Sequence, residues 1–119
     1  MSPIHVAVTL TSIGSTNEAY EAKFLVDTGA TDSLVPASEL ARIGVEPGGK
    51  TGYELADGIV HEFRFGLVEI RFMNEVTAGV IFASDNSEPI LGVTALDSVG
   101  VSIDPGSRTL ERLPAISLK

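Results

Sequence analysis

The sequence predicts a single, mostly β domain with one or two short helices, closed into a barrel or stacked as a sandwich. Three observations lead to this fold class. Apolar and polar residues alternate at the period-2 spacing of half-buried strands, turn-forming residues recur between these stretches, and only two segments suit a helix. The chain has 119 residues with 12 Gly and 6 Pro, which fits one domain over residues 1–119 with many turns.

The first part of the chain is expected to form two strands, a tight loop and a short helix. Ile4 to Leu10 alternates apolar and polar residues, and a second strand runs from about Glu18 into Val26. This strand leads directly into Asp27-Thr28-Gly29, so that it delivers a carboxylate into a tight loop. Ala37 to Ile43 can form two helical turns, and Gly44 would end them.

A hairpin is expected in the middle of the chain. Thr51–Ala56 and Ile59–Phe63 flank Asp57-Gly58, a pair that favours the positive φ angles of a tight hairpin turn. Further strands are expected at Val68–Phe72, Val76–Phe82, Val101–Ile103 and Thr109–Leu113, with a short helix at Thr94–Val99.

Composition excludes several classes of protein. The absence of Cys excludes disulfides, a thiol nucleophile and thiolate metal sites, so oxygen and nitrogen groups must supply any chemistry, and no cofactor is implied. A net charge of -8 with scattered Lys and Arg argues against nucleic acid and favours a cationic peptide as partner. No apolar run approaches the roughly 18 residues of a membrane span and no signal-peptide pattern is present, so we expect a cytoplasmic protein without a membrane partner.

Asp27-Thr28-Gly29 is a weak motif alone, because chance produces it in roughly a few per cent of chains of this length. Its surroundings make it specific: an apolar strand before it, Ala30-Thr31-Asp32-Ser33 after it, a hairpin centred on Asp57-Gly58, and Ile90-Leu91-Gly92 before a short helix. In this order the features resemble the retropepsin-like, or retroviral-type, aspartic peptidase family, in a cellular or bacterial single-domain form. The resemblance covers most of the chain and implies a closed, barrel-like acid-protease fold and a homodimer.

The resemblance also implies an activity, that of an aspartic endopeptidase. Asp27 of two chains would face one another across a water molecule and share one proton, so the partners are a second copy of the chain and a peptide or protein substrate. Thr28, Gly29 and Ala30 would support the loop, and the hairpin would close over the substrate as a flap. The candidate substrate-binding residues are Asp32, Tyr53, Ala56, Asp57, Gly58, Ile90 and Leu91.

Two positions depart from the viral members of that family. Those members carry an acidic residue and an Arg where this chain has Thr31 and Val93. Because the acidic residue and the Arg are both absent, no charged residue is left without its partner. The departure points to a cellular branch of the family and leaves open how the dimer is braced and how peptide ends are held.

Other interpretations of the same residues remain. The chain can be a non-catalytic dimerisation or peptide-binding module of the same fold, in which Asp27 only caps backbone amides. Gly44 to Thr51 matches a phosphate-binding loop, but such a loop must follow a strand and open a helix, and Pro47 removes an amide donor. His61-Glu62 begins like a zinc peptidase motif, yet Phe65 stands where the second His is needed, so no metal is expected.

Overall fold

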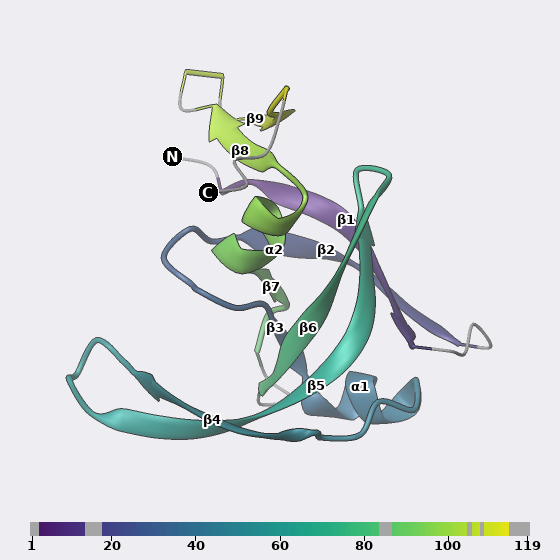
Figure 1. Ribbon diagram of the computed structural model, residues 1–119, viewed down its shortest axis with the longest axis vertical. Helices are drawn as coiled ribbons and strands as arrows, with labels where there is room; N and C mark the ends of the chain where they lie inside the picture. Colours follow the sequence, from purple (N-terminus) through teal and green to yellow (C-terminus); the bar gives the residue numbers. More distant parts are fainter. Residues whose placement is uncertain (1–2, 14–17, 84–86, 105, 108, 115–119) are drawn as a thin grey trace.

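A seven-stranded sheet forms most of the protein, whose computed structural model describes residues 3–13, 18–83, 87–104, 106–107 and 109–114. The strands are β1 (His5–Ser12), β2 (Ala19–Val26), β3 (Leu34–Pro36), β4 (Gly49–Glu54), β5 (Val60–Phe72), β6 (Glu75–Ala83) and β7 (Ile90–Leu91). Their order in the sheet is β1-β2-β7-β3-β6-β5-β4, and β1 pairs in addition with β5 (Figure 1).

Two short helices and a small second sheet complete the described fold. The helices are α1 (Ala37–Arg42) and α2 (Val93–Ser98), and the second sheet is the antiparallel pair of β8 (Val101–Asp104) and β9 (Thr109–Arg112). The mostly β class with one or two short helices is therefore confirmed. α1 ends where Gly44 adopts a φ of 85°, as expected for the glycine that follows a helix. In the described part of the chain, no helix is long and apolar enough to cross a membrane.

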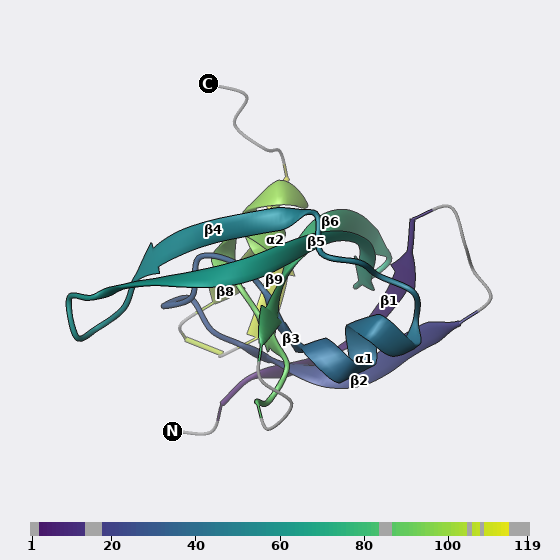
Figure 2. The same cartoon turned by 90° about the horizontal axis from the view of Figure 1, so that it is seen from below.

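The expected closed barrel is not found, because β4 pairs with β5 alone among the described strands and leaves an open edge. The sequence suggested separate strands ending at Phe63 and starting at Val68, whereas β5 runs unbroken through both. Its first half pairs with β4, and its second half pairs with β1 and β6. β4 thus forms the edge of the sheet, and the β4–β5 hairpin extends away from the body in both views (Figures 1 and 2).

The core lies between the curled sheet and the two helices. Alternate residues of β1 and β5 are buried, including Leu10 and Ile70, as the period-2 pattern predicts. Leu40 of α1 and Ile43, which directly follows this helix, also join the core. Each such side chain contributes about 1.5–3 kcal/mol when it leaves water, so the hydrophobic pattern holds the strands around the site in place.

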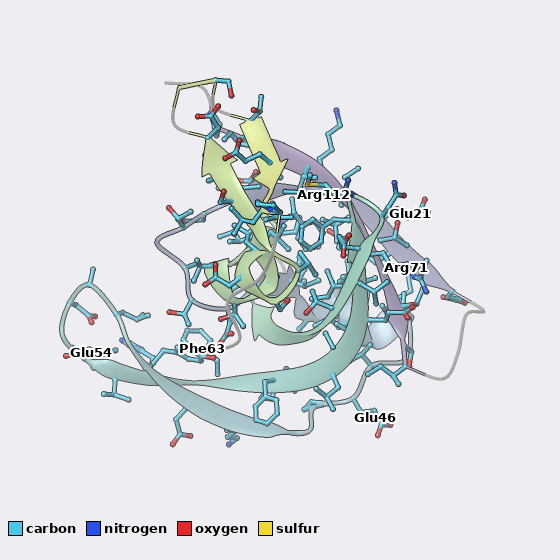
Figure 3. The ribbon with its side chains drawn as sticks, turned by 45° about the horizontal axis from the view of Figure 1, so that its top comes forward. Glu21, Glu46, Glu54, Phe63, Arg71 and Arg112 are labelled. Carbon is cyan, nitrogen blue, oxygen red and sulfur yellow. The ribbon has the colours of Figure 1, made fainter. Side chains whose placement is uncertain are left out.

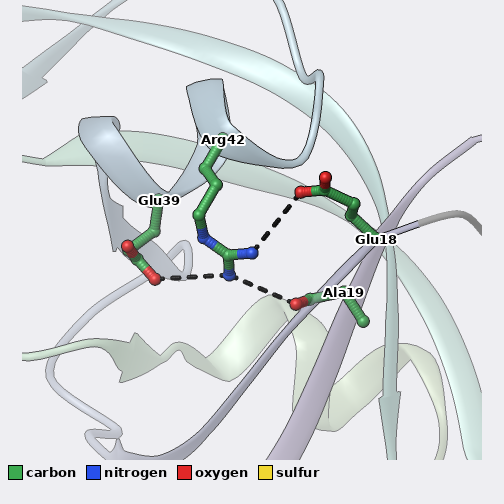
Figure 4. Close-up of polar contacts among 4 residues, drawn as sticks. All are labelled: Glu18, Ala19, Glu39 and Arg42. Atoms are coloured by element: carbon green, nitrogen blue, oxygen red, sulfur yellow. Dashed lines mark hydrogen bonds and ion pairs between the residues drawn. The ribbon is translucent and has the colours of Figure 1, made fainter.

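Arg42 links helix α1 to the beginning of β2 through a hydrogen bond and ion pairs (Figure 4). The guanidinium donates to the carbonyl of Ala19 at 3.2 Å and lies 3.6 Å from a Glu18 carboxylate oxygen. It also lies 3.5 Å from a carboxylate oxygen of Glu39 on its own helix. Exposed ion pairs of this kind add little stability, but these contacts orient the helix that follows β3.

Candidate active site

The loop that carries Asp27, residues 27–33, connects β2 to β3 across an intervening strand. β2 pairs with β7 in parallel and β3 pairs with β7 in antiparallel fashion. β7 therefore lies between the two strands that the loop joins. The loop must arch over the end of β7, where the chain turns into α2.

Backbone hydrogen bonds hold Asp27 in a fixed orientation at the start of this loop. Its N–H donates to the carbonyl of Leu91 at 3.1 Å, and its own carbonyl accepts from the N–H of Ala30 at 3.1 Å. The N–H of Gly29 donates to Oδ1 of its carboxylate at 2.9 Å. Oδ2 accepts no hydrogen bond from any residue that the structure describes. Asp27 is half-buried, whereas Thr28 and Gly29 are exposed, so the loop presents a fixed carboxylate beside exposed backbone.

The second half of the loop is bound to the start of α2. The carbonyls of Ala30 and Thr31 accept from the N–H groups of Val93 and Thr94, each at 2.9 Å. These backbone bonds involve both positions at which the sequence departs from the viral pattern. They connect the loop to α2 without a charged pair.

Gly92 allows the loop and the end of β7 to approach very closely. Its N–H donates to the buried hydroxyl of Ser33 at 3.0 Å. A Cβ atom at Gly92 would lie only 2.5 Å from the carbonyl carbon of Asp32 and 2.6 Å from its oxygen. Because both atoms belong to the backbone, a side chain could not be accommodated there without moving the loop.

The β4–β5 hairpin turns where the sequence predicts. Gly58 has a φ of 79°, and its N–H donates to the carbonyl of Leu55 at 2.9 Å. The Asp57 carboxylate accepts from the N–H of Ile59 at 2.9 Å. The predicted Asp57-Gly58 turn is therefore confirmed.

A cleft of about 260 Å³ lies between the loop and the hairpin. The hydroxyl of Tyr53, on β4, donates a hydrogen bond to Oδ2 of Asp32 in the loop. Burial, followed by this hydrogen bond and the Asp32 charge, raises the pKa of Tyr53 to about 12. The ring of Tyr53 packs edge-on against Phe63, with 6.0 Å between centroids. The residues that line the cleft are Gly29, Ala30, Thr31, Asp32, Leu34, Tyr53, Glu54, Leu55 and Phe63.

Some of the predicted site residues line this cleft, and others lie outside it. The predicted residues that line the cleft are Gly29, Ala30, Asp32 and Tyr53, and Asp27 with Thr28 directly precede them in the loop. Ala56, Asp57 and Gly58 are exposed at the hairpin turn and do not line the cleft.

Leu91 plays a different part from the one expected, whereas substrate contact by Ile90 stays a prediction. The side chain of Leu91 is fully buried in the core, and its carbonyl accepts the N–H of Asp27. Ile90 is half-buried and pairs with Leu25 and Leu34 of the neighbouring strands. The side chain of Leu91 is therefore out of reach of a substrate, and it supports the loop from within the core.

Sequence reasoning missed several residues of the cleft, and for Phe63 a signal was available. Tyr53 lies opposite His61 in the hairpin, so the period-2 rule places Phe63 on the same face as Tyr53. Figure 3 shows Phe63 on the hairpin below the body of the protein. Leu34 carries no such signal, because its place in the cleft depends on how β3 packs. The lining residues that were not anticipated are Thr31, Leu34, Glu54, Leu55 and Phe63.

The remaining motifs are not assembled into sites. Gly44 to Thr51 leads from α1 into strand β4, and the N–H of Gly48 donates to the carbonyl of Phe65 at 2.8 Å. This segment opens no helix, which a phosphate-binding loop requires. His5 lies 2.9 Å from Glu88, whereas His61 lies 3.4 Å from Asp57 on the hairpin. Among the residues described, no three potential ligands form a metal-binding group.

Comparison with known proteins gives a family and a fold. A family model described as "gag-polyprotein putative aspartyl protease" matches residues 14–98, which is more than half of the chain. No curated protein sequence matches. The EIAV protease complexed with the inhibitor HBY-793 superposes with a TM-score of 0.60 at 22% identity, over 87% of this chain and 93% of that one.

Two other solved structures are similar. The retroviral protease-like domain of Ddi1 from Leishmania major has a TM-score of 0.58 at 16% identity, over 97% of this chain and 91% of that one. A retropepsin-like aspartic protease from Rickettsia conorii has a TM-score of 0.45 at 19% identity, over 84% of each chain. At such identities the first two likenesses show the fold. The chain adopts the retropepsin fold and belongs to the family of gag-polyprotein aspartyl proteases.

Proposed function

We propose that the protein is an aspartic endopeptidase that acts as a homodimer, in which Asp27 of each chain is half of the catalytic pair. The observation that carries this proposal is the setting of Asp27. It stands at the end of β2, is oriented by backbone hydrogen bonds, and keeps Oδ2 free of partners among the described residues. The family and the fold support the same assignment.

The proposed homodimer rests on the number of Asp-Thr-Gly loops, because the mechanism needs two and each chain supplies one. The chain has one Asp-Thr-Gly loop, and the exposed Thr28 and Gly29 are accessible to a second copy. Two such loops facing one another would place two carboxylates close together, where they cannot both ionise without a large cost. The pair would then share one proton and titrate as a unit.

The chemistry of the pair needs only carboxylates and water. The ionised Asp27 takes a proton from a water molecule as the water oxygen attacks the scissile carbonyl carbon. The protonated Asp27 of the other chain donates to the carbonyl oxygen. When the tetrahedral intermediate collapses, the carbon–nitrogen bond breaks and the amine leaves with the proton taken from water. A hydroxyl of the intermediate returns a proton to the other carboxylate, so the pair again holds one proton.

The β4–β5 hairpin would act as the flap over the bound peptide. Its tip carries exposed apolar side chains, with Ile59 at 59% and Val60 at 66% exposure. Exposed apolar groups on an extended hairpin suit contact with a partner or substrate. Closure of this hairpin, from Tyr53 to Val60, would exclude water from the cleft.

The substitution Asp27→Asn tests the assignment. We expect it to reduce cleavage of an unfolded protein substrate to background, because Asn cannot accept the proton of water, while circular dichroism and the dimer mass stay unchanged. Asp97→Asn is the control, because it removes the same charge at an exposed position on α2. It should retain activity. Cleavage by pure Asp27→Asn protein at the wild-type rate would refute the proposal. Peptide binding without turnover by the wild type between about pH 3 and 8 would instead indicate a non-catalytic module.

A further inference from the structure

The cleft combines an apolar wall with one carboxylate that has a neutral partner. Leu34, Leu55 and Phe63 supply apolar surface, and Asp32 is the acid that the Tyr53 hydroxyl contacts. The volume of about 260 Å³ lies below the range of sites that hold drug-sized ligands. A space of this size and lining fits one side chain of a substrate.

The contact with Tyr53 satisfies one oxygen of Asp32 but does not neutralise its charge. Because the pKa of Tyr53 is raised to about 12, the phenol stays protonated near neutral pH and acts only as a neutral donor. The lining includes a second acid, Glu54, and among the described residues no Lys or Arg lines the cleft. A half-buried carboxylate in such surroundings is stabilised by a cation more than by a neutral donor.

Lysine and arginine side chains match this arrangement in both of their parts. Their aliphatic stems can pack on Leu34 and Phe63 while the charged end reaches Asp32. The net charge of -8 also attracts cationic peptides over a longer range. An uncharged side chain of the same length gains only the packing.

We propose that Asp32 selects substrates with a lysine or arginine side chain, and that the Tyr53 hydroxyl occupies its carboxylate while the cleft is empty. The proposal rests on the peptidase function above and names the substrate class of that site. Asp32 is then a specificity-determining residue, and Tyr53 is a competitor that the substrate displaces. Because Tyr53 belongs to the hairpin, its displacement couples substrate recognition to the position of the flap.

The test compares lysine with norleucine, which keeps the stem and lacks the charge. The scan starts from one peptide that the protein cleaves. Each position near the scissile bond is replaced in turn by lysine and by norleucine, and kcat/KM is measured for both peptides at every position. We expect one position at which lysine is favoured by about 10-fold or more, the size of a charge-assisted hydrogen bond. Asp32→Asn should bring that ratio to about 1. Glu21→Gln, which removes a charge on the side of the molecule opposite the hairpin (Figure 3), should leave it unchanged.

The variant Tyr53→Phe separates competition from a structural role. If the hydroxyl competes with substrate, its removal lowers KM for the lysine peptide and leaves the norleucine peptide unaffected, so the ratio rises. If Tyr53 only supports the hairpin, both peptides change by the same factor, and its role as a competitor is overturned.

Binding separates failure of this inference from failure of the proposed function. Anisotropy of labelled lysine and norleucine peptides on the Asp27→Asn variant measures the preference without turnover. If the lysine peptide binds more tightly but the wild type cleaves neither peptide, the peptidase function is refuted and the role of Asp32 is supported. Cleavage that depends on Asp27 but shows no preference for lysine at any position would overturn the role of Asp32 and keep the function.

Discussion

Two carboxylates in the same loop are held in different ways. Asp27 is oriented by the N–H of Gly29, two residues away, whereas Asp32 is contacted by a hydroxyl of the hairpin, 21 residues away. Movement of the hairpin therefore leaves Asp27 in place and removes the partner of Asp32. This division suits a site in which catalysis needs a fixed acid and recognition needs an acid whose partner can move away.

The Tyr53 contact should be visible in an alkaline titration. The raised pKa means that the neutral phenol stabilises the fold fully below pH 10.0, its ordinary pKa, and that this contribution is lost as pH rises toward about 12. The chain has two Tyr, so the tyrosinate absorbance of the wild type minus that of Tyr53→Phe reports Tyr53 alone. We expect a midpoint near 12 that Asp32→Asn lowers. A midpoint at the ordinary value, unchanged by Asp32→Asn while the protein is folded, would contradict the contact.

Sequence patterns identified some of these residues because their signals are local. Asp27 and Gly29 are neighbours in the chain, so the motif itself describes their geometry. The contact between Asp32 and Tyr53 depends on the path of a hairpin relative to a loop, which no local pattern encodes. The buried position of Leu91 carries no local signal, because a strand of two residues is too short for alternation to show which side chain faces the core.

At the scale of elements, the crossing of the loop over β7 is what positions the site. Its tightest point is Gly92 against the backbone of Asp32. Strand β7 pairs with both flanking strands over only one or two residues, so these few contacts determine the loop geometry. A small displacement here moves Asp27 and Asp32 together.

The substitution Gly92→Ala tests this crossing. The added methyl group would meet backbone atoms at 2.5 Å, and we expect a loss of about 1–3 kcal/mol in the free energy of unfolding together with a strong loss of cleavage. Urea denaturation and a peptide cleavage assay measure the two effects. Gly48→Ala is the control, because its Cβ would meet other atoms only at 3.9 Å. Wild-type stability and activity of Gly92→Ala would show that the crossing does not constrain the site.

Across the whole molecule, the strands were predictable, but the way they assemble into one sheet with an open edge was not. Alternation in β1 and β2, the turn at Asp57-Gly58 and the glycine after α1 each specify local structure, and each matches the fold. The unbroken course of β5 is a long-range property, because residues 64–66 continue the strand through pairing with β4 and β6. The hairpin thus lies outside the body, where it can cover a cleft.

The chain as a whole provides half of the proposed site, so cleavage should require two copies with Asp27. Wild-type and Asp27→Asn chains can be refolded together in equal amounts, at a total concentration where dimers predominate, and assayed for cleavage. If both Asp27 residues are needed, random pairing leaves about one quarter of the dimers active, so activity falls to about one quarter of that of pure wild type. If each chain acted alone, activity would be about one half, and that result would contradict the paired Asp27 mechanism.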